Sequence, residues 1–362
     1  MTTNSRPVLV VENDPFLRII QIALDPSTSK ERIEAFAEFF EHDLPDFDGY
    51  LQEVRDASAG LYPAEVRLVD SQEELLEALN GADAVVVESL QVGEAELATA
   101  DKVRVVQKFG TILRNIDTNA LEAHGVALRT QRRRANIACA EHTLAMLLEL
   151  AKKFNRIGGL ISFEQLQAAG YSPRLWNRTH TATSGWARVS GIKMLYESTF
   201  GIIGMGEIGR ELALRALPFG MKLLYTQRTP MSPEDEQRYG VEYAPLPELL
   251  AASDWVSVQL PGNTSTENYL NRAEIAQMKP GAVLINTSRP QIINRDAVLE
   301  ALRSGRLGGF ALDTIYEVPG RSDDELLGFD NVFITPWTAA QPRFNALNDL
   351  REVITGIGAA LR

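Results

Sequence analysis

Three glycines at a fixed spacing are the residues of this sequence whose pattern points most directly to chemistry. Gly204, Gly206 and Gly209 follow a short apolar run, Thr199–Ile203, and precede a helical pattern at Arg210–Leu217. In a strand–turn–helix of this kind the first glycine permits a tight turn, the second lets the backbone approach a pyrophosphate, and the third lets helix and strand pack closely. The helix N-terminus adds free N–H groups and a positive dipole end. The pattern predicts a nicotinamide dinucleotide site, with Glu207 and Ile208 of the turn among its contacts.

The end of the next strand bears on which dinucleotide binds. An acid at this place hydrogen-bonds the ribose 2′-hydroxyl and repels a 2′-phosphate. Here the strand Lys222–Tyr225 is followed by Thr226 and then by the uncharged Gln227, the cation Arg228 and the hydroxyl of Thr229. Because no acid stands there, we expect a preference for NADP, although NAD can also be accommodated.

Several further motifs occur in a fixed order after the glycine turn. They are Ser253-Asp254, a strand ending in Leu260-Pro261, Met278-Lys279-Pro280-Gly281, Asn286-Thr287-Ser288-Arg289, Ala311-Leu312-Asp313 and Thr335-Pro336. In this order the chain resembles the D-isomer-specific 2-hydroxyacid dehydrogenase family over about residues 103–340. The segments Ala140-Glu141-His142 and Phe109–Asp117 extend the likeness toward the N-terminus.

The resemblance implies an organisation in two domains. Residues 1–140 and 338–362 would form the substrate domain, and residues 141–337 would bind the dinucleotide, with the active site in the cleft between them. It also implies a homodimer built around the helix Asn136–Lys153. The irregular segment 158–198 that follows is long for a compact domain, so we expect it to cross an interface or cover a site.

The resemblance also assigns roles to individual residues. Arg289 would hold or polarise a small anionic substrate, and Asp313 would hold the nicotinamide carboxamide. Further cofactor contacts are expected at Leu260, Pro261, Thr266, Thr287, Ser288 and Arg289 itself. Substrate contacts are expected at Lys108, Gly110, Thr111, Ile112 and Arg133.

The sequence departs from the family where the proton is handled. Trp337 stands after Thr335-Pro336, where the family has a histidine, and Val318 stands at the position of the glutamate that orients it, next to Glu317. An indole N–H donates a hydrogen bond but does not exchange a proton as imidazole does. We therefore expect Arg289, Glu317 and Trp337 to form an altered catalytic set. Pro290 and Ile112 also replace glycines of the family pattern.

Three functional interpretations follow from this departure. The first is an oxidoreductase that transfers a hydride at a carbonyl or hydroxyl carbon with another acid, for which Lys108, Tyr316, Glu317 and His180 are candidates. The second is an enzyme that keeps its nicotinamide cofactor tightly bound for a non-standard conversion, with Trp337 as a wall for an aromatic substrate. The third is a non-catalytic protein that senses the dinucleotide. Retention of Arg289 and Asp313 favours chemistry. We expect His42 and His124 at the surface or at caps, and His142 in packing.

The elements that position these residues alternate between strands and helices, which is typical of parallel sheets. The expected strands are Val8–Glu12, Val66–Val69, Ala84–Val87, Val103–Val106, Val126–Thr130, Thr199–Ile203, Lys222–Tyr225, Val256–Leu260, Ala282–Asn286, Gly309–Asp313 and Val332–Thr335. Added helices are expected between Phe16 and Ala57, and a C-terminal helix at Arg343–Leu361. The predicted fold class is α/β, with two Rossmann-like domains, of which the first is flavodoxin-like.

Net charge, hydrophobicity and cysteine content limit the classes of partner that we expect for this chain. The formal charge is −12, so we expect no nucleic-acid binding, since Arg132-Arg133-Arg134 is too short a basic run to offset it. No apolar run approaches the roughly 20 residues of a membrane helix, and we expect neither a membrane partner nor a metal site. The single cysteine, Cys139, has apolar neighbours and is expected to be a packed small residue. These features favour a cytoplasmic protein.

Overall fold

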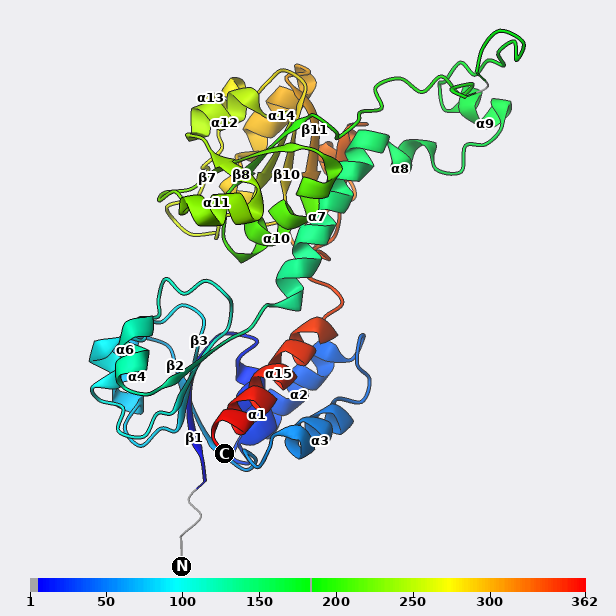
Figure 1. The fold of residues 1–362 in the computed structure, drawn as a ribbon. Coiled ribbons are helices and arrows are strands. Elements are labelled where there is room, and N and C mark those ends of the chain that lie inside the picture. The colour runs from blue at the N-terminus through cyan, green and yellow to red at the C-terminus, as the bar shows by residue number, and fades with distance from the viewer. Residues whose placement is uncertain (1–5, 183) are drawn as a thin grey trace, which may run out of the picture. The chain divides into compact units, whose positions relative to one another are not determined.

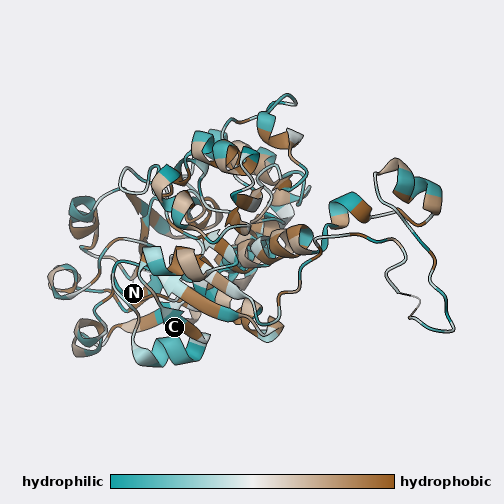
Figure 2. Ribbon diagram, turned by 90° about the horizontal axis from the view of Figure 1, so that it is seen from above, coloured by the Kyte–Doolittle hydropathy of each residue, from teal (hydrophilic) through white to brown (hydrophobic). Residues whose placement is uncertain are grey.

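The structure is a computed structural model that describes residues 6–182 and 184–362. It divides into two compact units (Figure 1). The described residues of the first are 6–138 and 340–362, and those of the second are 139–182 and 184–339. Each unit is built around a parallel sheet, which confirms the predicted fold class. Hydrophobic residues concentrate on the strands and on the helix faces that pack against them (Figure 2).

The sheet of the first unit has five parallel strands in the order β2-β1-β3-β4-β5, which is flavodoxin-like. The strands are β1 (Val8–Glu12), β2 (Glu65–Val69), β3 (Ala84–Val87), β4 (Val105–Lys108) and β5 (Ala127–Thr130). The predicted strand at Val103–Val106 was wrong by two residues. The buried polar residues Gln107 and Lys108 continue the ladder by backbone pairing with β3 and β5. Their side chains are satisfied there, since Gln107 Nε2 donates to the Lys108 carbonyl and Lys108 Nζ donates to the Glu88 carbonyl.

Helices cover both faces of this sheet (Figure 1). They are α1 (Arg18–Leu24), α2 (Lys30–Phe40), α3 (Phe47–Ala57), α4 (Gln72–Ala78), α5 (Glu94–Leu97), α6 (Thr118–Ala123) and α15 (Phe344–Ala360). The added helices expected between Phe16 and Ala57 are α1 to α3. Ser29 caps the start of α2, because its hydroxyl accepts the N–H of Arg32. The larger hydrophobic core of this unit lies between the sheet and the helices α1, α3 and α15.

The sheet of the second unit has seven parallel strands in the order β12-β11-β10-β9-β6-β7-β8. They are β6 (Thr199–Ile203), β7 (Lys222–Thr226), β8 (Val241–Tyr243), β9 (Trp255–Val258), β10 (Ala282–Asn286), β11 (Leu307–Leu312) and β12 (Val332–Ile334). The chain reverses its strand order between β6 and β9. In open parallel sheets, ligands bind at the carboxyl ends of the strands at such a point.

The helices of this unit include α7 (Arg134–Lys152), which begins in the first unit, and α10 (Glu207–Ala216), which follows the glycine turn. The others are α8 (Phe154–Ile157), α9 (Phe163–Ala168), η1 (Leu217–Phe219), α11 (Pro233–Tyr239), α12 (Leu246–Ala252), α13 (Arg272–Gln277), η2 (Pro290–Ile292), α14 (Arg295–Arg303) and η3 (Glu325–Gly328).

The segment 158–198 contains the short helix α9, which the sequence did not predict. Ser162 caps this helix by a reciprocal pair of hydrogen bonds with Gln165. Farther along, the Phe163 and Trp186 rings stack at 5.5 Å, and the N–H of Arg174 donates to the Trp186 carbonyl at 2.7 Å. Within this segment the chain therefore makes contacts with itself.

Candidate cofactor and active site

The glycine turn has the conformation that its sequence predicted. Gly204 has φ of +102°, and a Cβ built on it would lie 2.4 Å from the Gln259 carbonyl oxygen. A Cβ on Gly209 would lie 2.2 Å from the Gly204 carbonyl oxygen. These two positions cannot accept a side chain without a shift of the backbone, because both contacts are shorter than any real Cβ makes. They bring the start of α10 against β6.

Gly206 differs from the other two glycines. A Cβ built on it would meet no atom within 4 Å, and the residue is the N-cap of the ten-residue helix α10. An open position at the start of a helix exposes backbone N–H groups to a ligand, and the helix dipole favours an anion there. This geometry fits the pyrophosphate of a dinucleotide. Glu207 and Ile208 lie in the first turn of α10 and are half-buried.

The end of β7 offers a cation next to a neutral amide. Arg228 is exposed and forms no ion pair within the described part of the chain. The Gln227 side chain turns back, since its Nε2 donates to the Thr229 carbonyl at 2.7 Å. None of the residues from Thr226 to Thr229 carries the carboxylate that would repel a 2′-phosphate.

The loop after β9 is held by one hydroxyl. Thr266 is buried, its Oγ1 donates to the Pro261 carbonyl at 2.7 Å, and it accepts the N–H of Asn263 at 3.0 Å. Leu260 is half-buried and Pro261 is exposed. Thr266 thus shapes the turn, while Leu260 and Pro261 keep accessible surface.

A buried polar cluster joins α7 to the carboxyl ends of β9 and β10. Thr143 Oγ1 lies 2.8 Å from Thr287 Oγ1, and Gln259 Nε2 donates to Thr287 Oγ1 at 3.1 Å. Ser288 Oγ donates to the Val258 carbonyl at 2.9 Å. The hydroxyls of Thr287 and Ser288, both predicted to contact the cofactor, are therefore engaged with the protein in this structure.

Arg289 lies just after the carboxyl end of β10, an interior strand of the second sheet. Its Cβ–Cγ stem lies over Gly262, where a Cβ would come within 2.5 Å of Arg289 Cγ. Its guanidinium donates to the Ser288 carbonyl at 3.0 Å and lies over the Trp337 ring. Across residues 6–182 and 184–362 no carboxylate pairs with it. Arg289 is therefore an exposed cation fixed along its stem, as a group that receives an anion should be.

Trp337 is half exposed, at 48%, and its backbone is left-handed, with φ of +59°. The backbone N–H of Trp337 donates to the backbone carbonyl oxygen of Asp313 at 2.9 Å. A non-glycine residue with positive φ is uncommon outside functional sites and turns, because the conformation costs about 1 kcal/mol or more. The structure thus brings together three predicted site residues, Arg289, Asp313 and Trp337.

The Asp313 carboxylate is buried, at 1% exposure, and is surrounded by donors. Oδ1 accepts the Thr335 hydroxyl at 2.7 Å and the Thr338 N–H at 2.8 Å, and Oδ2 accepts the Ala339 N–H at 3.1 Å. These bonds fix the end of β11 to the chain after β12. Asp313 therefore has a structural role in addition to the one predicted for it.

His142 reaches the same carboxylate from α7, which sequence reasoning missed. Its Nε2 lies 3.0 Å from Thr335 Oγ1 and 3.5 Å from Asp313 Oδ1. We had expected His142 in packing. The sequence carried no signal for this contact, because His142 and Asp313 are far apart in the chain and lie on different elements.

Two of the candidate acids fit that role poorly. Tyr316 donates its hydroxyl to the Ile293 carbonyl at 3.0 Å, and burial raises the pKa of this phenol well above its usual range. His180 is exposed in a turn in which its N–H donates to the Asn177 carbonyl. Glu317 is exposed, as is Val318 beside it. Tyr316 is therefore a weak candidate for the acid, because its proton is held more tightly than in a free phenol.

The predicted substrate residues of the first unit gather at the end of β4. Arg133 Nη1 forms a 2.6 Å ion pair with Glu88, and its guanidinium lies 4.3 Å from the Phe109 ring centroid. Burial raises the pKa of Glu88, while the Arg133 charge opposes this. Lys108 is buried. Gly110 has φ of +150°, Thr111 is exposed and Ile112 is half-buried.

Three other predictions concern isolated residues. His124 lies at the C-terminus of α6 and pairs with Glu94 at 3.2 Å, which agrees with a cap or surface role. His42 is exposed. Cys139, expected to be a packed small residue, is half-buried on α7. Among the described residues no group of three or more His, Cys, Asp or Glu could hold a metal ion, and no helix is long and apolar enough to cross a membrane.

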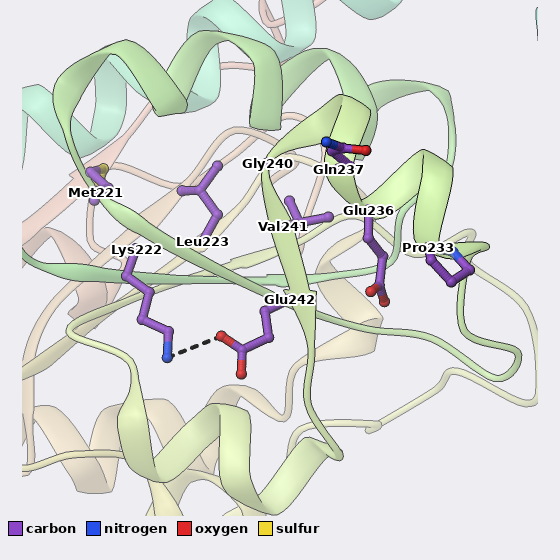
Figure 3. A pocket seen from close by; sticks show the side chains of 9 residues that line it. All are labelled: Met221, Lys222, Leu223, Pro233, Glu236, Gln237, Gly240, Val241 and Glu242. Atoms are coloured by element: carbon purple, nitrogen blue, oxygen red, sulfur yellow. Dashed lines mark ion pairs between the residues drawn. The ribbon is translucent and has the colours of Figure 1, made fainter.

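A surface pocket of about 430 Å³ lies elsewhere in the second unit (Figure 3). It is formed at the amino ends of β7 and β8, where Lys222 and Glu242 pair at 3.1 Å. The glycine turn lies at the carboxyl end of β6, which is the opposite edge of a parallel sheet. This pocket is therefore separate from the dinucleotide site.

Known proteins resemble this chain in sequence and in fold. Residues 172–339 match the model of the D-isomer specific 2-hydroxyacid dehydrogenase, NAD binding domain. Glyoxylate reductase of Thermococcus onnurineus is 32% identical over 268 residues, which are 74% of this chain and 76% of that protein. Glyoxylate/hydroxypyruvate reductase B of Yersinia pestis is 29% identical over 79% of this chain and 85% of its own length.

Among solved structures, D-mandelate dehydrogenase of Rhodotorula graminis is similar in fold. It has a TM-score of 0.56 at 22% identity and covers 97% of this chain and 93% of its own. The matched sequence includes the glycine turn, Arg289 and Asp313, whose geometry is that of a dinucleotide site. The chain therefore belongs to the D-isomer specific 2-hydroxyacid dehydrogenase family, whose members are oxidoreductases that act on CH–OH groups with NAD(P).

Proposed function

We propose that this protein reduces a 2-keto acid to the corresponding 2-hydroxy acid with a nicotinamide dinucleotide, preferably NADPH. The observation that carries the proposal is the exposed guanidinium of Arg289, fixed between Gly262 and Trp337 without a carboxylate partner in the described chain. When bound, the dinucleotide supplies the hydride. Gly204 to Gly209 would hold its pyrophosphate, and Asp313 would hold its carboxamide.

Arg289 would serve the substrate in two ways. Its planar fork can bind a carboxylate with two parallel hydrogen bonds. Its fixed charge can also stabilise the negative oxygen that hydride addition leaves on the carbonyl. Trp337 would form an apolar wall beside that oxygen, which suits an aromatic keto acid. Lys108, Gly110, Thr111, Ile112 and Arg133 stay candidates for further substrate contacts.

The proton that completes the reduction needs a source other than the residue at position 337. An indole N–H donates hydrogen bonds but does not act as an acid at ordinary pH, and the Tyr316 phenol is held by the Ile293 carbonyl. We infer that the alkoxide takes its proton from a water molecule that the exposed Glu317 can orient, and that a proton from bulk solvent neutralises the hydroxide left behind. Hydride and proton together convert the C=O bond to CH–OH.

Preference for NADPH rests on the end of β7. Arg228 is exposed there, and the Gln227 amide is turned toward the Thr229 carbonyl. A guanidinium binds a phosphate more strongly than a hydroxyl, because the hydrogen bonds are charge-assisted. Thr229 can add a hydroxyl donor to the same phosphate.

The proposal is tested by following NADPH oxidation at 340 nm with a panel of aliphatic and aromatic 2-keto acids. Turnover is expected with at least one acid, and Arg289→Ala should lower kcat/KM by about 100-fold or more. Arg272→Ala is the matched control, because Arg272 pairs with Glu300 on the surface. An unchanged rate in Arg289→Ala, or cofactor binding without any turnover, would contradict the proposal. In the second case a cofactor that copurifies would favour a bound-cofactor enzyme, and one that exchanges freely would favour a sensor.

We also propose a cytoplasmic homodimer. Several large apolar side chains of the segment 158–198 are exposed, including Ile161 at 81%, Leu175 at 69% and Met194 at 65%. A second copy of the chain would bury them at the predicted interface around α7. Light scattering on the purified protein should give twice the chain mass of 40.0 kDa, and a mass of one chain at micromolar concentration would contradict the dimer.

A further inference from the structure

Two consecutive hydrogen-bonding contacts connect α7 to the carboxylate proposed to anchor the nicotinamide. His142 Nε2 lies 3.0 Å from Thr335 Oγ1, which in turn lies 2.7 Å from Asp313 Oδ1. The direct distance from His142 Nε2 to Asp313 Oδ1 is 3.5 Å. His142 therefore acts on Asp313 mainly through the Thr335 hydroxyl.

The direction of these hydrogen bonds follows from the groups involved. A carboxylate oxygen accepts, so the single hydroxyl hydrogen of Thr335 is donated to Asp313. Thr335 Oγ1 can then only accept from His142, and the hydrogen in that contact belongs to Nε2. The tautomer or protonation state of His142 is thereby restricted to forms that carry hydrogen on Nε2.

Asp313 has nearly all of its acceptor positions filled. Oδ1 takes the Thr335 hydroxyl and the Thr338 N–H, and Oδ2 takes the Ala339 N–H. An ionised carboxylate offers about four positions. By this count one acceptor position remains on Oδ2, and the three bonds already made restrict how the carboxylate can turn.

We propose that His142 is a positioning residue for the nicotinamide ring. Its Nε2–H orders the Thr335 hydroxyl, which holds Asp313 so that the remaining position on Oδ2 accepts the N–H of the cofactor carboxamide. The inference rests on the proposed role of Asp313 as the carboxamide anchor. Helix α7 would thus help to orient the bound cofactor, in addition to packing its apolar faces against the second unit.

The test compares two ligands that differ at one end. The first is NADPH, and the second is 2′-phospho-ADP-ribose, which lacks the nicotinamide. Dissociation constants are measured by calorimetry on the full chain and on His142→Leu, which removes the donor. Affinity for NADPH should fall about tenfold, as for one lost hydrogen bond to a charged group, while affinity for the fragment should stay within about twofold.

Two matched variants separate the hydrogen bond from packing. His142→Gln keeps an N–H donor of similar reach and should restore NADPH affinity to within about threefold of that of the unsubstituted chain. Thr335→Val should reproduce His142→Leu, Thr335→Ser should not, and the double variant His142→Leu with Thr335→Val should bind no more weakly than either single one. His124→Leu, which removes a surface ion pair, should leave both affinities unchanged.

Four results would overturn the inference. They are equal weakening of both ligands in His142→Leu, no weakening of either, a His142→Gln variant as weak as His142→Leu, and full additivity in the double variant. Failure of the unsubstituted chain to bind either ligand would instead contradict the proposed function, and the inference would fall with it.

Discussion

The guanidinium of Arg289 lies over the indole ring of Trp337, with 5.6 Å between Arg289 Cζ and the ring centroid. A cation over the face of a tryptophan is attracted by the ring quadrupole. Both side chains are exposed, so the contact mainly restricts where the guanidinium can point. Trp337 therefore orients the guanidinium that we propose to bind the substrate.

Removal of the aromatic ring should weaken this orientation. Trp337→Leu is expected to lower kcat/KM by roughly threefold to fivefold, since an exposed cation–π contact contributes about 0.5–1 kcal/mol. Trp337→Phe should lose less. Steady-state kinetics with the best keto acid checks this, and a Trp337→Leu enzyme as active as the unsubstituted one would count against the contact.

Cofactor selectivity should depend on Arg228. Arg228→Ala is expected to weaken NADPH binding about tenfold and to leave NADH binding nearly unchanged, because the lost bonds are to the 2′-phosphate. Fluorescence titration with both cofactors measures the ratio. Arg238→Ala is the matched control, since Arg238 is exposed on the following helix α11. Equal losses for both cofactors would show that Arg228 contributes charge without selectivity.

Two glycines of the turn should separate binding from folding. Gly206→Val places a side chain in the open space where the pyrophosphate is proposed to bind, so it should abolish dinucleotide binding. Because that side chain meets no protein atom, the free energy of unfolding should change little. Gly209→Val forces a side chain against the Gly204 carbonyl and should destabilise the fold by about 1–3 kcal/mol or more. Urea unfolding and cofactor titration of both variants give the comparison. Loss of stability in Gly206→Val would contradict the open geometry.

A buried carboxylate in the first unit gives a pH-dependent prediction. Asp349 is 1% exposed, and its Oδ1 accepts from Arg134 at 2.7 Å. Burial raises the pKa of Asp349 above its usual value, and the Arg134 guanidinium opposes that rise. A carboxyl with a raised pKa in the folded state favours folding below the unfolded-state pKa. That contribution is lost as the pH rises through the folded-state pKa.

Arg134→Met should enlarge this effect. The variant leaves Asp349 buried without its cation, so stability near neutral pH should fall by about 3 kcal/mol. The loss should shrink as the pH is lowered through the further raised pKa of Asp349. Urea unfolding between pH 4.5 and 7 measures it, and Asp349→Asn in the same background should recover most of the loss. A penalty independent of pH would exclude the buried charge as its cause.

Sequence patterns identified the strands that are buried on both faces. The predicted bounds of β1, β3, β6 and β10 match the structure, because runs of β-branched residues are typical of interior parallel strands. The edge strand β8 was missed, since its three residues, Val241–Tyr243, carry no periodicity.

The candidate site was predictable where backbone chemistry demands a residue type. The glycine turn could be predicted from the sequence, because a side chain on Gly204 or Gly209 would clash with the backbone. The contact of His142 with Asp313 could not be read, because it depends on how α7 packs across the strand ends. Similarly, the Arg289–Trp337 contact depends on the left-handed backbone of Trp337, which no local pattern indicated.

The hydroxyl of Thr143 has a mechanical consequence. Its contact with Thr287 at 2.8 Å lies in a buried place where water cannot take over the hydrogen bond. Apolar side chains tolerate small slips past one another, whereas Thr143 Oγ1 keeps its hydrogen bonds only at fixed distances from the Cys139 carbonyl and Thr287 Oγ1. Helix α7 therefore has a fixed axial register on the second sheet, and any rearrangement of this unit must either preserve that register or break the bond in a dry interior.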